Sequence, residues 1–147
     1  MKLQDEYTLN AAIEEVWEHL LDEGSLAGLI PGCKKLVKSA PGEYEAVIPV
    51  KLLLFKSDFS VRLKILEEDR PNFCRFHCRI EGSLGGGEVE GSVRLKDLEG
   101  KTLLGYEADI ALSSGLGKMG GRIIESSGKD KIRQGLEKLE SKIYASH

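Results

Sequence analysis

The sequence lacks the features of a membrane-spanning or secreted chain. Its longest nearly apolar run, residues 47–55, contains Pro49 and Lys51 and is far shorter than the ~20 residues that a helix needs to cross a bilayer. The first six residues contain no apolar stretch of the kind found in a secretory signal. We therefore expect a cytoplasmic protein.

The chain also lacks a block of basic residues. It contains 21 Lys and Arg against 24 Asp and Glu, which gives a formal net charge of -3. Affinity for nucleic acid comes largely from a basic surface that neutralises phosphates. This charge balance argues against a general nucleic-acid binder.

Proline is scarce, and the chain has no internal repeat and no linker-like segment. Four prolines, 41% hydrophobic residues and 31% charged residues are typical of a folded protein. A chain of this length buries roughly two thirds of the surface that its unfolded form would expose. We predict a single domain, residues 1–147, whose core needs no disulfide or metal.

Cysteine is rare, and the three thiols, Cys33, Cys74 and Cys78, show no CxxC spacing. Cys74 and Cys78 lie on one predicted strand, where four residues separate them by about 13 Å. That distance is too great for a disulfide or a shared tetrahedral metal. We predict three free, buried thiols in a reducing compartment.

No catalytic constellation is evident. The three histidines, His19, His77 and His147, fall on a helix, on the polar face of a strand and at the terminus, whereas a triad or His–metal site needs convergence. Residues 115–120 match the GxGxxG pattern of dinucleotide sites, but no second parallel strand follows the helix, as that site requires. We predict no catalytic residue, no cofactor and no metal, and we expect that the protein is not an enzyme.

What the sequence does contain is clear periodicity, beginning near the N-terminus. Residues 2–9 predict a strand, and Asn10 is placed to cap the helix that follows. A second short helix ends at Pro31-Gly32, a pair that breaks helices. The apolar positions of these two helices recur at helical spacing: Ile13, Val16, Trp17, Leu20 and Leu21, then Leu26, Leu29 and Ile30.

Between residues 33 and 112 the apolar period changes to two, which predicts strands with one buried and one polar face. Short turns, such as Pro41-Gly42 and Glu99-Gly100, imply antiparallel neighbours. The glycine-rich stretch 82–87 predicts a bulged hairpin or a mobile flap. The strands are long, so their twist should curve the sheet strongly.

After Ser114 the period returns to 3.6, and an apolar stripe continues over nearly thirty residues. A helix of that length measures about 40 Å and can cross the concave side of a sheet. We predict an α+β fold: a curved, seven-stranded antiparallel sheet, two short helices after the first strand, and a long C-terminal helix across the concave face.

The inner face of this sheet is the most distinctive chemical feature. A curved sheet that holds one helix often leaves an apolar pocket with a few polar groups, although the same side chains can fill a solid core. Tyr44, Tyr106 and two free thiols could supply the polar groups. The residues predicted to line the pocket are Phe55, Phe59, Phe76, Tyr106, Met119 and Ile123, and those predicted at its mouth are Pro31, Gly32, Gly86, Gly117 and Gly120.

Several local motifs resemble one protein family over nearly the whole chain. The motifs are Ala12-Ile13-Glu14-Glu15-Val16-Trp17, Leu29-Ile30-Pro31-Gly32-Cys33, Glu43-Tyr44-Glu45-Ala46, the turn after Glu67-Glu68-Asp69, Gly87-Glu88-Val89-Glu90-Gly91, Leu103-Leu104-Gly105-Tyr106-Glu107-Ala108-Asp109 and Gly120-Gly121-Arg122-Ile123-Ile124. They resemble those of the CoxG-like family of carbon monoxide dehydrogenase subunits, within the START-like helix-grip (SRPBCC) superfamily.

The resemblance implies an internal cavity that binds a hydrophobic small molecule, a lipid or a quinone, without catalysis. It also implies an accessory role for a molybdenum hydroxylase of the carbon monoxide dehydrogenase type, in membrane recruitment or quinone-linked electron delivery, with peripheral contact to the inner face of the membrane. The chain departs from the family at Leu52-Leu53-Leu54, where relatives tend to have a glycine-containing turn, and it ends at His147 without the extension of some relatives. Two other functions stay open: a protein-interaction module with a packed core, and a cyclase or hydrolase of the same superfamily.

Overall fold

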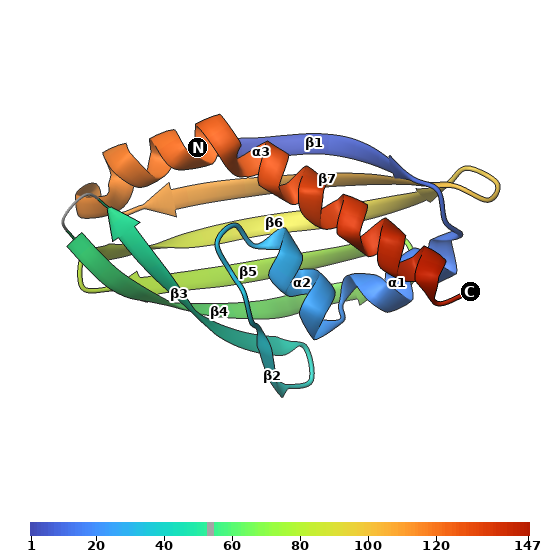
Figure 1. Cartoon of the computed structure of the whole chain (residues 1–147), viewed down its shortest axis with the longest axis horizontal. Coiled ribbons are helices and arrows are strands. Elements are labelled where there is room, and N and C mark those ends of the chain that lie inside the picture. The colour runs from blue at the N-terminus through green and yellow to red at the C-terminus, as the bar shows by residue number, and fades with distance from the viewer. Residues whose placement is uncertain (53–54) are drawn as a thin grey trace.

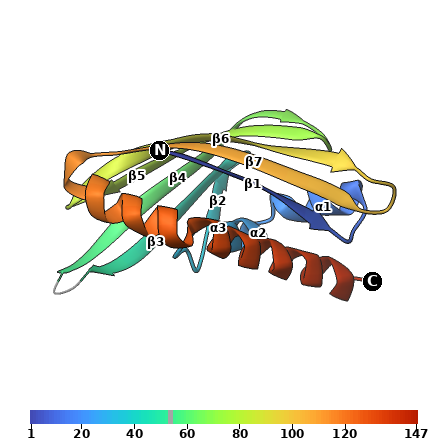
Figure 2. The same cartoon turned by 90° about the horizontal axis from the view of Figure 1, so that it is seen from above.

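A strongly curved antiparallel sheet holds three helices on its concave side (Figures 1 and 2). The computed structural model describes residues 1–52 and 55–147, without the side chains of residues 52, 55, 114–120 and 123. The elements, in chain order, are β1 (Lys2–Leu9), α1 (Ile13–Leu20), α2 (Glu23–Leu29), β2 (Val37–Ala40), β3 (Glu43–Leu52), β4 (Phe55–Asp69), β5 (Phe73–Gly82), β6 (Gly85–Asp97), β7 (Thr102–Leu112) and α3 (Ser114–Ala145).

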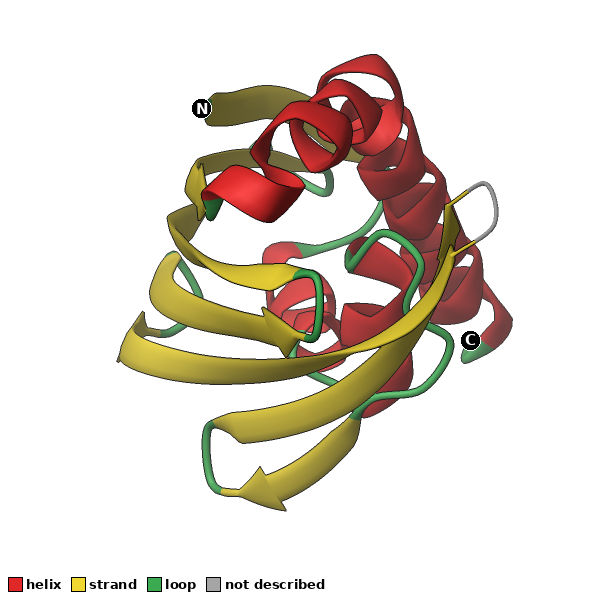
Figure 3. Cartoon of the chain, turned by 90° about the vertical axis from the view of Figure 1, so that its left-hand side faces the viewer, coloured by secondary structure: helices red, strands yellow, loops and turns green. Residues whose placement is uncertain are grey.

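The seven strands form one sheet in the order β1-β7-β6-β5-β4-β3-β2. From β2 to β7 each strand pairs with the next along the chain, and β1 pairs with β7 at the far edge. The view along the sheet shows how far it curves around the helices (Figure 3). The predicted fold class and element order are therefore confirmed.

The glycine-rich stretch between β5 and β6 forms a tight hairpin. Gly82 pairs with Gly85, so Ser83 and Leu84 alone make the turn. Gly85 has a φ of 125°, a conformation that side-chain-bearing residues rarely adopt. Of the two alternatives for residues 82–87, the structure shows the hairpin.

The prediction that Asn10 caps α1 is wrong. The residue at the N-cap position is Ala12, which has no side-chain capping bond. The backbone N–H of Asn10 instead donates to Oε2 of Glu140 on α3, at 2.6 Å. This contact joins residues far apart in the sequence, so local capping rules could not reveal it.

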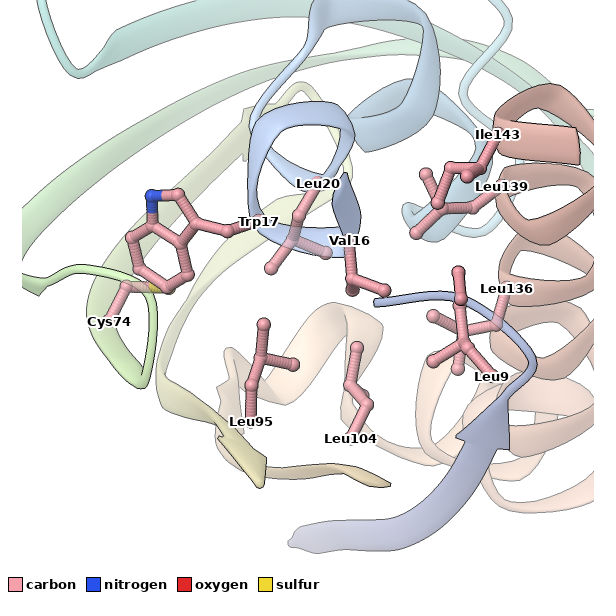
Figure 4. Close-up of a cluster of buried hydrophobic side chains, with 11 residues drawn as sticks. Leu9, Val16, Trp17, Leu20, Cys74, Leu95, Leu104, Leu136, Leu139 and Ile143 are labelled. Atoms are coloured by element: carbon pink, nitrogen blue, oxygen red, sulfur yellow. The ribbon is translucent and has the colours of Figure 1, made fainter. Parts of the chain in front are cut away.

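The core closes at the end of the sheet where α1 and the C-terminal half of α3 meet it (Figure 4). Leu136, Leu139 and Ile143 of α3 are each 1 or 2% exposed there. They pack in a cluster with side chains from five other elements and from the loop between β1 and α1: Leu9, Ala11, Val16, Trp17, Leu20, Cys74, Leu95 and Leu104. A second cluster lies between α2 and strands β3 to β5.

Helices α2 and α3 cross in backbone contact. A Cβ atom added to Gly135 of α3 would overlap the carbonyl oxygen of Gly28 in α2. Beside this crossing, the Lys142 ammonium lies 2.7 Å from the Asp22 carboxylate and holds the pKa of Asp22 below its ordinary value. The glycine pair thus allows α2 to lie directly against the C-terminal half of α3.

The crossing predicts unequal effects for two matched substitutions. Gly135→Ala should lower the free energy of unfolding by about 1–3 kcal/mol, the usual cost of overpacking. Gly28→Ala should be neutral or slightly stabilising, because its Cβ would lie 3.8 Å from Gly135 and Ala favours a helix over Gly. Urea denaturation of both variants measures the difference, and equal destabilisation would show that the helices do not cross in this way.

Within the described residues, no helix is both long enough and apolar enough to cross a membrane.

Candidate ligand-binding site

The inner face of β5, β6 and β7 changes along its length from closed core to partly exposed surface. Leu95 and Leu104, near α1, are buried, but toward the other end most inward positions stay half-buried. An apolar side chain that faces a closed core loses nearly all of its exposure, and these positions retain part of theirs. We call this half-buried stretch of the inner face the inner hollow and define it by Phe76, Ile80, Val89, Gly91, Tyr106, Ala108 and Leu112. Cys78 and Ile110, on the same face, are buried.

Two glycines on the inner face leave room for side chains of the neighbouring strands to lie flat on the sheet. A Cβ at Gly91 would lie 2.6 Å from Cζ of Phe76, so the Phe76 ring extends over the space that a side chain at position 91 would occupy. In the same way Leu112 covers Gly87 on the adjacent strand, at 2.8 Å from the Cβ position. Large side chains therefore lie along the sheet instead of projecting into the hollow.

The predicted lining residues occupy different positions in this arrangement. Phe76 and Tyr106 are half-buried on the inner face, in neighbouring rows, because Phe76 pairs with Gly91 and Gly91 with Ala108. Phe59 is only 4% exposed, and its ring packs against Gly82, beside the hollow. The other three predicted lining residues lie outside the described side chains: Phe55, Met119 and Ile123.

Two predicted mouth residues lie toward the same end of the sheet. Gly86 exchanges two hydrogen bonds with Ser113 at the start of α3: its N–H donates to Ser113 Oγ, and its carbonyl accepts from the Ser113 N–H. Gly32 lies against Ile48, which pairs with Phe59 near the β5–β6 hairpin. Pro31, beside Gly32, is exposed; the remaining two, Gly117 and Gly120, lie outside the residues whose surroundings are described.

One inward carboxylate was missed by the sequence reasoning. Asp5 lies between Leu3 and Tyr7, and all three face inward on β1, as the period of two could have indicated. Its carboxylate accepts a hydrogen bond from Arg133 of α3 at 3.2 Å. The pair lies at the edge of the hollow, where it also fixes α3 against β1.

The thiols are poor nucleophiles. Burial raises the pKa of Cys74 to about 11 and that of Cys78 to about 12, so both stay protonated at neutral pH. Cys33 is only half-buried, which corrects the prediction of three buried thiols: it lies in the loop after α2, where its thiol donates to the Lys35 carbonyl.

Metal ligands do not converge in the described part of the chain. No three side chains of His, Cys, Asp or Glu there are placed to hold a metal ion.

The buried thiols predict a loss of stability in alkali. In the unfolded chain they titrate near 9.0, while the folded state holds their protons more tightly. Their stabilising effect is therefore complete below about pH 9 and disappears as the pH rises through about 11 to 12. Urea denaturation between pH 8 and 11 should show this decline, and a Cys74→Ala/Cys78→Ala variant should show a shallower one. An equally steep decline in the variant would contradict the assignment.

Comparison with known proteins gives one family and several structures. The family model for CoxG, a carbon monoxide dehydrogenase subunit, matches residues 6–144. No curated protein sequence matches this chain. A conserved protein from Geobacillus kaustophilus has a similar structure, with a TM-score of 0.85 and 23% identity over 100% of this chain and 97% of that one.

Two more distant structures share the fold. A protein from Thermus thermophilus gives a TM-score of 0.68 with 15% identity, over 99% of each chain. The ZhuI aromatase/cyclase from a Streptomyces species gives 0.67 with 17% identity, over 97% of this chain and 95% of that one. Together these likenesses show the helix-grip fold, and the fold alone.

Proposed function

Because the chain belongs to the CoxG family of carbon monoxide dehydrogenase subunits, we propose that it binds an apolar small molecule in the inner hollow, as a non-catalytic accessory of a molybdenum hydroxylase. The observation that carries the proposal is the half-buried apolar surface of Phe76, Ile80 and Val89 on the concave face. A protein without a ligand leaves this surface partly hydrated, and a ligand covers it.

Burial of an apolar tail supplies enough free energy for useful affinity. Each buried methylene contributes about 0.8 kcal/mol, so a tail of about ten methylenes gains on the order of 8 kcal/mol before the costs of association. A lipid or a prenylated quinone has a tail of this kind. The family name connects the chain with carbon monoxide dehydrogenase, and a carrier of quinone would suit an enzyme that must dispose of electrons.

The inner charges support binding more than catalysis. An enzyme of this fold would need an acid or base with a perturbed pKa inside the cavity. Among the described inner residues, the carboxylate nearest the hollow is that of Asp5, and Arg133 neutralises it. We therefore propose that the protein is not an enzyme.

Filling the hollow should abolish binding. Val89 faces inward and is half-buried, whereas Val47 is 60% exposed on the outer face of β3. Val89→Trp should weaken the binding of N-phenyl-1-naphthylamine, measured by fluorescence titration, at least about tenfold, a change of about 1.4 kcal/mol. Val47→Trp adds the same side chain outside the hollow and should leave the affinity unchanged.

The same prediction can be tested directly by extracting the purified protein with solvent and analysing the extract by mass spectrometry. A bound lipid or quinone is expected from the wild type and from Val47→Trp, but not from Val89→Trp. The carrier function is wrong if the wild type yields no ligand and also binds the fluorophore without saturation.

The accessory role predicts a functional link to the hydroxylase. Carbon-monoxide-dependent quinone reduction by a purified enzyme of this class should proceed faster when the protein is added. Val47→Trp should retain the stimulation and Val89→Trp should lose it. Stimulation that survives in Val89→Trp would favour an interaction module over a carrier.

A further inference from the structure

A small surface pocket lies at the closed end of the core, between the loop after β1 and the last turns of α3. Its volume is about 250 Å³, and the residues that line it are Asn10, Glu140, Ser141 and Tyr144. On β7 the inner hollow extends from Tyr106 away from this end, since the end of β1 pairs with the start of β7. The pocket is therefore separate from the hollow.

The core holds both sides of the pocket in place. Three of its four lining residues directly follow core residues that are at most 2% exposed and belong to one packed cluster (Figure 4): Leu9, Leu139 and Ile143. The Asn10 N–H also donates to Glu140 Oε2 at 2.6 Å, which joins the two sides. Packing and this bond thus fix the backbone around the pocket.

The pocket presents an open aromatic ring and a carboxylate. Tyr144 is 82% exposed, more than any other large hydrophobic residue in the described part of the chain. Glu140 is half-buried, and no Lys, Arg or His among the described side chains forms an ion pair with it. Burial raises the pKa of the nearby Tyr7, and the charges of Glu140 and Glu137 raise it further. This face of α3 therefore attracts cations.

The same helix already shows what such a pair of groups binds. Two turns before Glu140, the Arg133 guanidinium lies 3.2 Å from the Asp5 carboxylate and 5.5 Å from the centroid of the Tyr7 ring. One cation is thus held by a carboxylate and a tyrosine ring together. Glu140 and Tyr144 offer the same two groups at the pocket, without a described cation between them.

We propose that the pocket receives an arginine side chain of a partner protein, with the guanidinium paired to Glu140 and stacked on the Tyr144 ring. A planar guanidinium can donate to a carboxylate through its edge while its face covers a ring, which a lysine ammonium cannot do. Tyrosine and arginine are also the residues most enriched at the centres of protein interfaces. The inference goes beyond the carrier function and does not depend on the hollow.

Two blocked tripeptides test the pairing, one with arginine and one with citrulline between two glycines. Citrulline has the shape of arginine without its charge. Titration at 0.15 M salt can be followed by the ¹⁵N NMR signal of the Asn10 amide, whose hydrogen is bonded to Glu140. The arginine peptide should shift this signal saturably and bind at least about tenfold more tightly than the citrulline peptide.

Substitutions in the pocket should separate the two contacts. Glu140→Gln keeps an acceptor for the Asn10 N–H and should weaken the arginine peptide about tenfold. Tyr144→Leu should weaken it about two- to fivefold, as the loss of one cation–π contact predicts, whereas Tyr144→Phe keeps the ring and the affinity. Glu137→Gln is the matched control: it removes the same charge one turn away, outside the pocket, and should change the affinity less than about twofold at this salt concentration.

Several results would overturn the proposal. They are an absence of saturable binding, equal affinity for the arginine and citrulline peptides, and an equal loss of affinity in Glu140→Gln and Glu137→Gln. Free L-arginine that binds more tightly than the blocked peptide would assign the pocket to a free amino acid and not to a partner protein.

The carrier function is tested separately in the same variants. Glu140→Gln and Tyr144→Leu should bind N-phenyl-1-naphthylamine as the wild type does, because neither residue lies in the hollow. If the fluorophore does not bind but the arginine peptide does, only the carrier function fails. If the fluorophore binds and the arginine peptide does not, only the role of the pocket is refuted.

Discussion

The backbone contact between Gly28 and Gly135 is the constraint on which the interior depends. It holds the C-terminal half of α3 against α2, and the same half of the helix inserts Leu136 and Leu139 into the closed core. The ion pairs that α3 makes with Asp5 and Asp22 also lie in this half. The residue before α3 is bonded to Gly86 at the other end of the sheet. Between these two attachments most inward positions of β5 to β7 stay half-buried, although Cys78 and Ile110 are buried.

The periodicity of the sequence was sufficient to predict the fold, because it depends on burial along each element. Alternation predicted the long strands, and the 3.6-residue stripe predicted α3. Glycine was ambiguous, since Gly82, Gly87 and Gly91 indicate bends and open space equally well. In the structure neither glycine marks open space, because the side chains of Phe76 and Leu112 lie over Gly91 and Gly87. A sequence without coordinates cannot show this.

The candidate site was predictable only to the level of residue type. Tyr44 and Tyr106 are both inward tyrosines, and nothing local distinguishes them. The difference is the Leu21 carbonyl, which approaches Tyr44 from a segment 23 residues away and satisfies one hydroxyl but not the other. The error at Asn10 has the same origin, since its partner is Glu140. Predictions that depended on long-range hydrogen bonds were the ones that the sequence could not support.

The fold also occurs in an aromatase/cyclase, so the proposed carrier function of this chain depends on the arrangement of its charges and not on the fold. The described charged residues near the hollow stay at its edge, where Arg133 neutralises Asp5, and the floor consists of apolar side chains and glycine. An apolar floor cannot stabilise a charged transition state, but it retains a hydrophobic molecule without altering it.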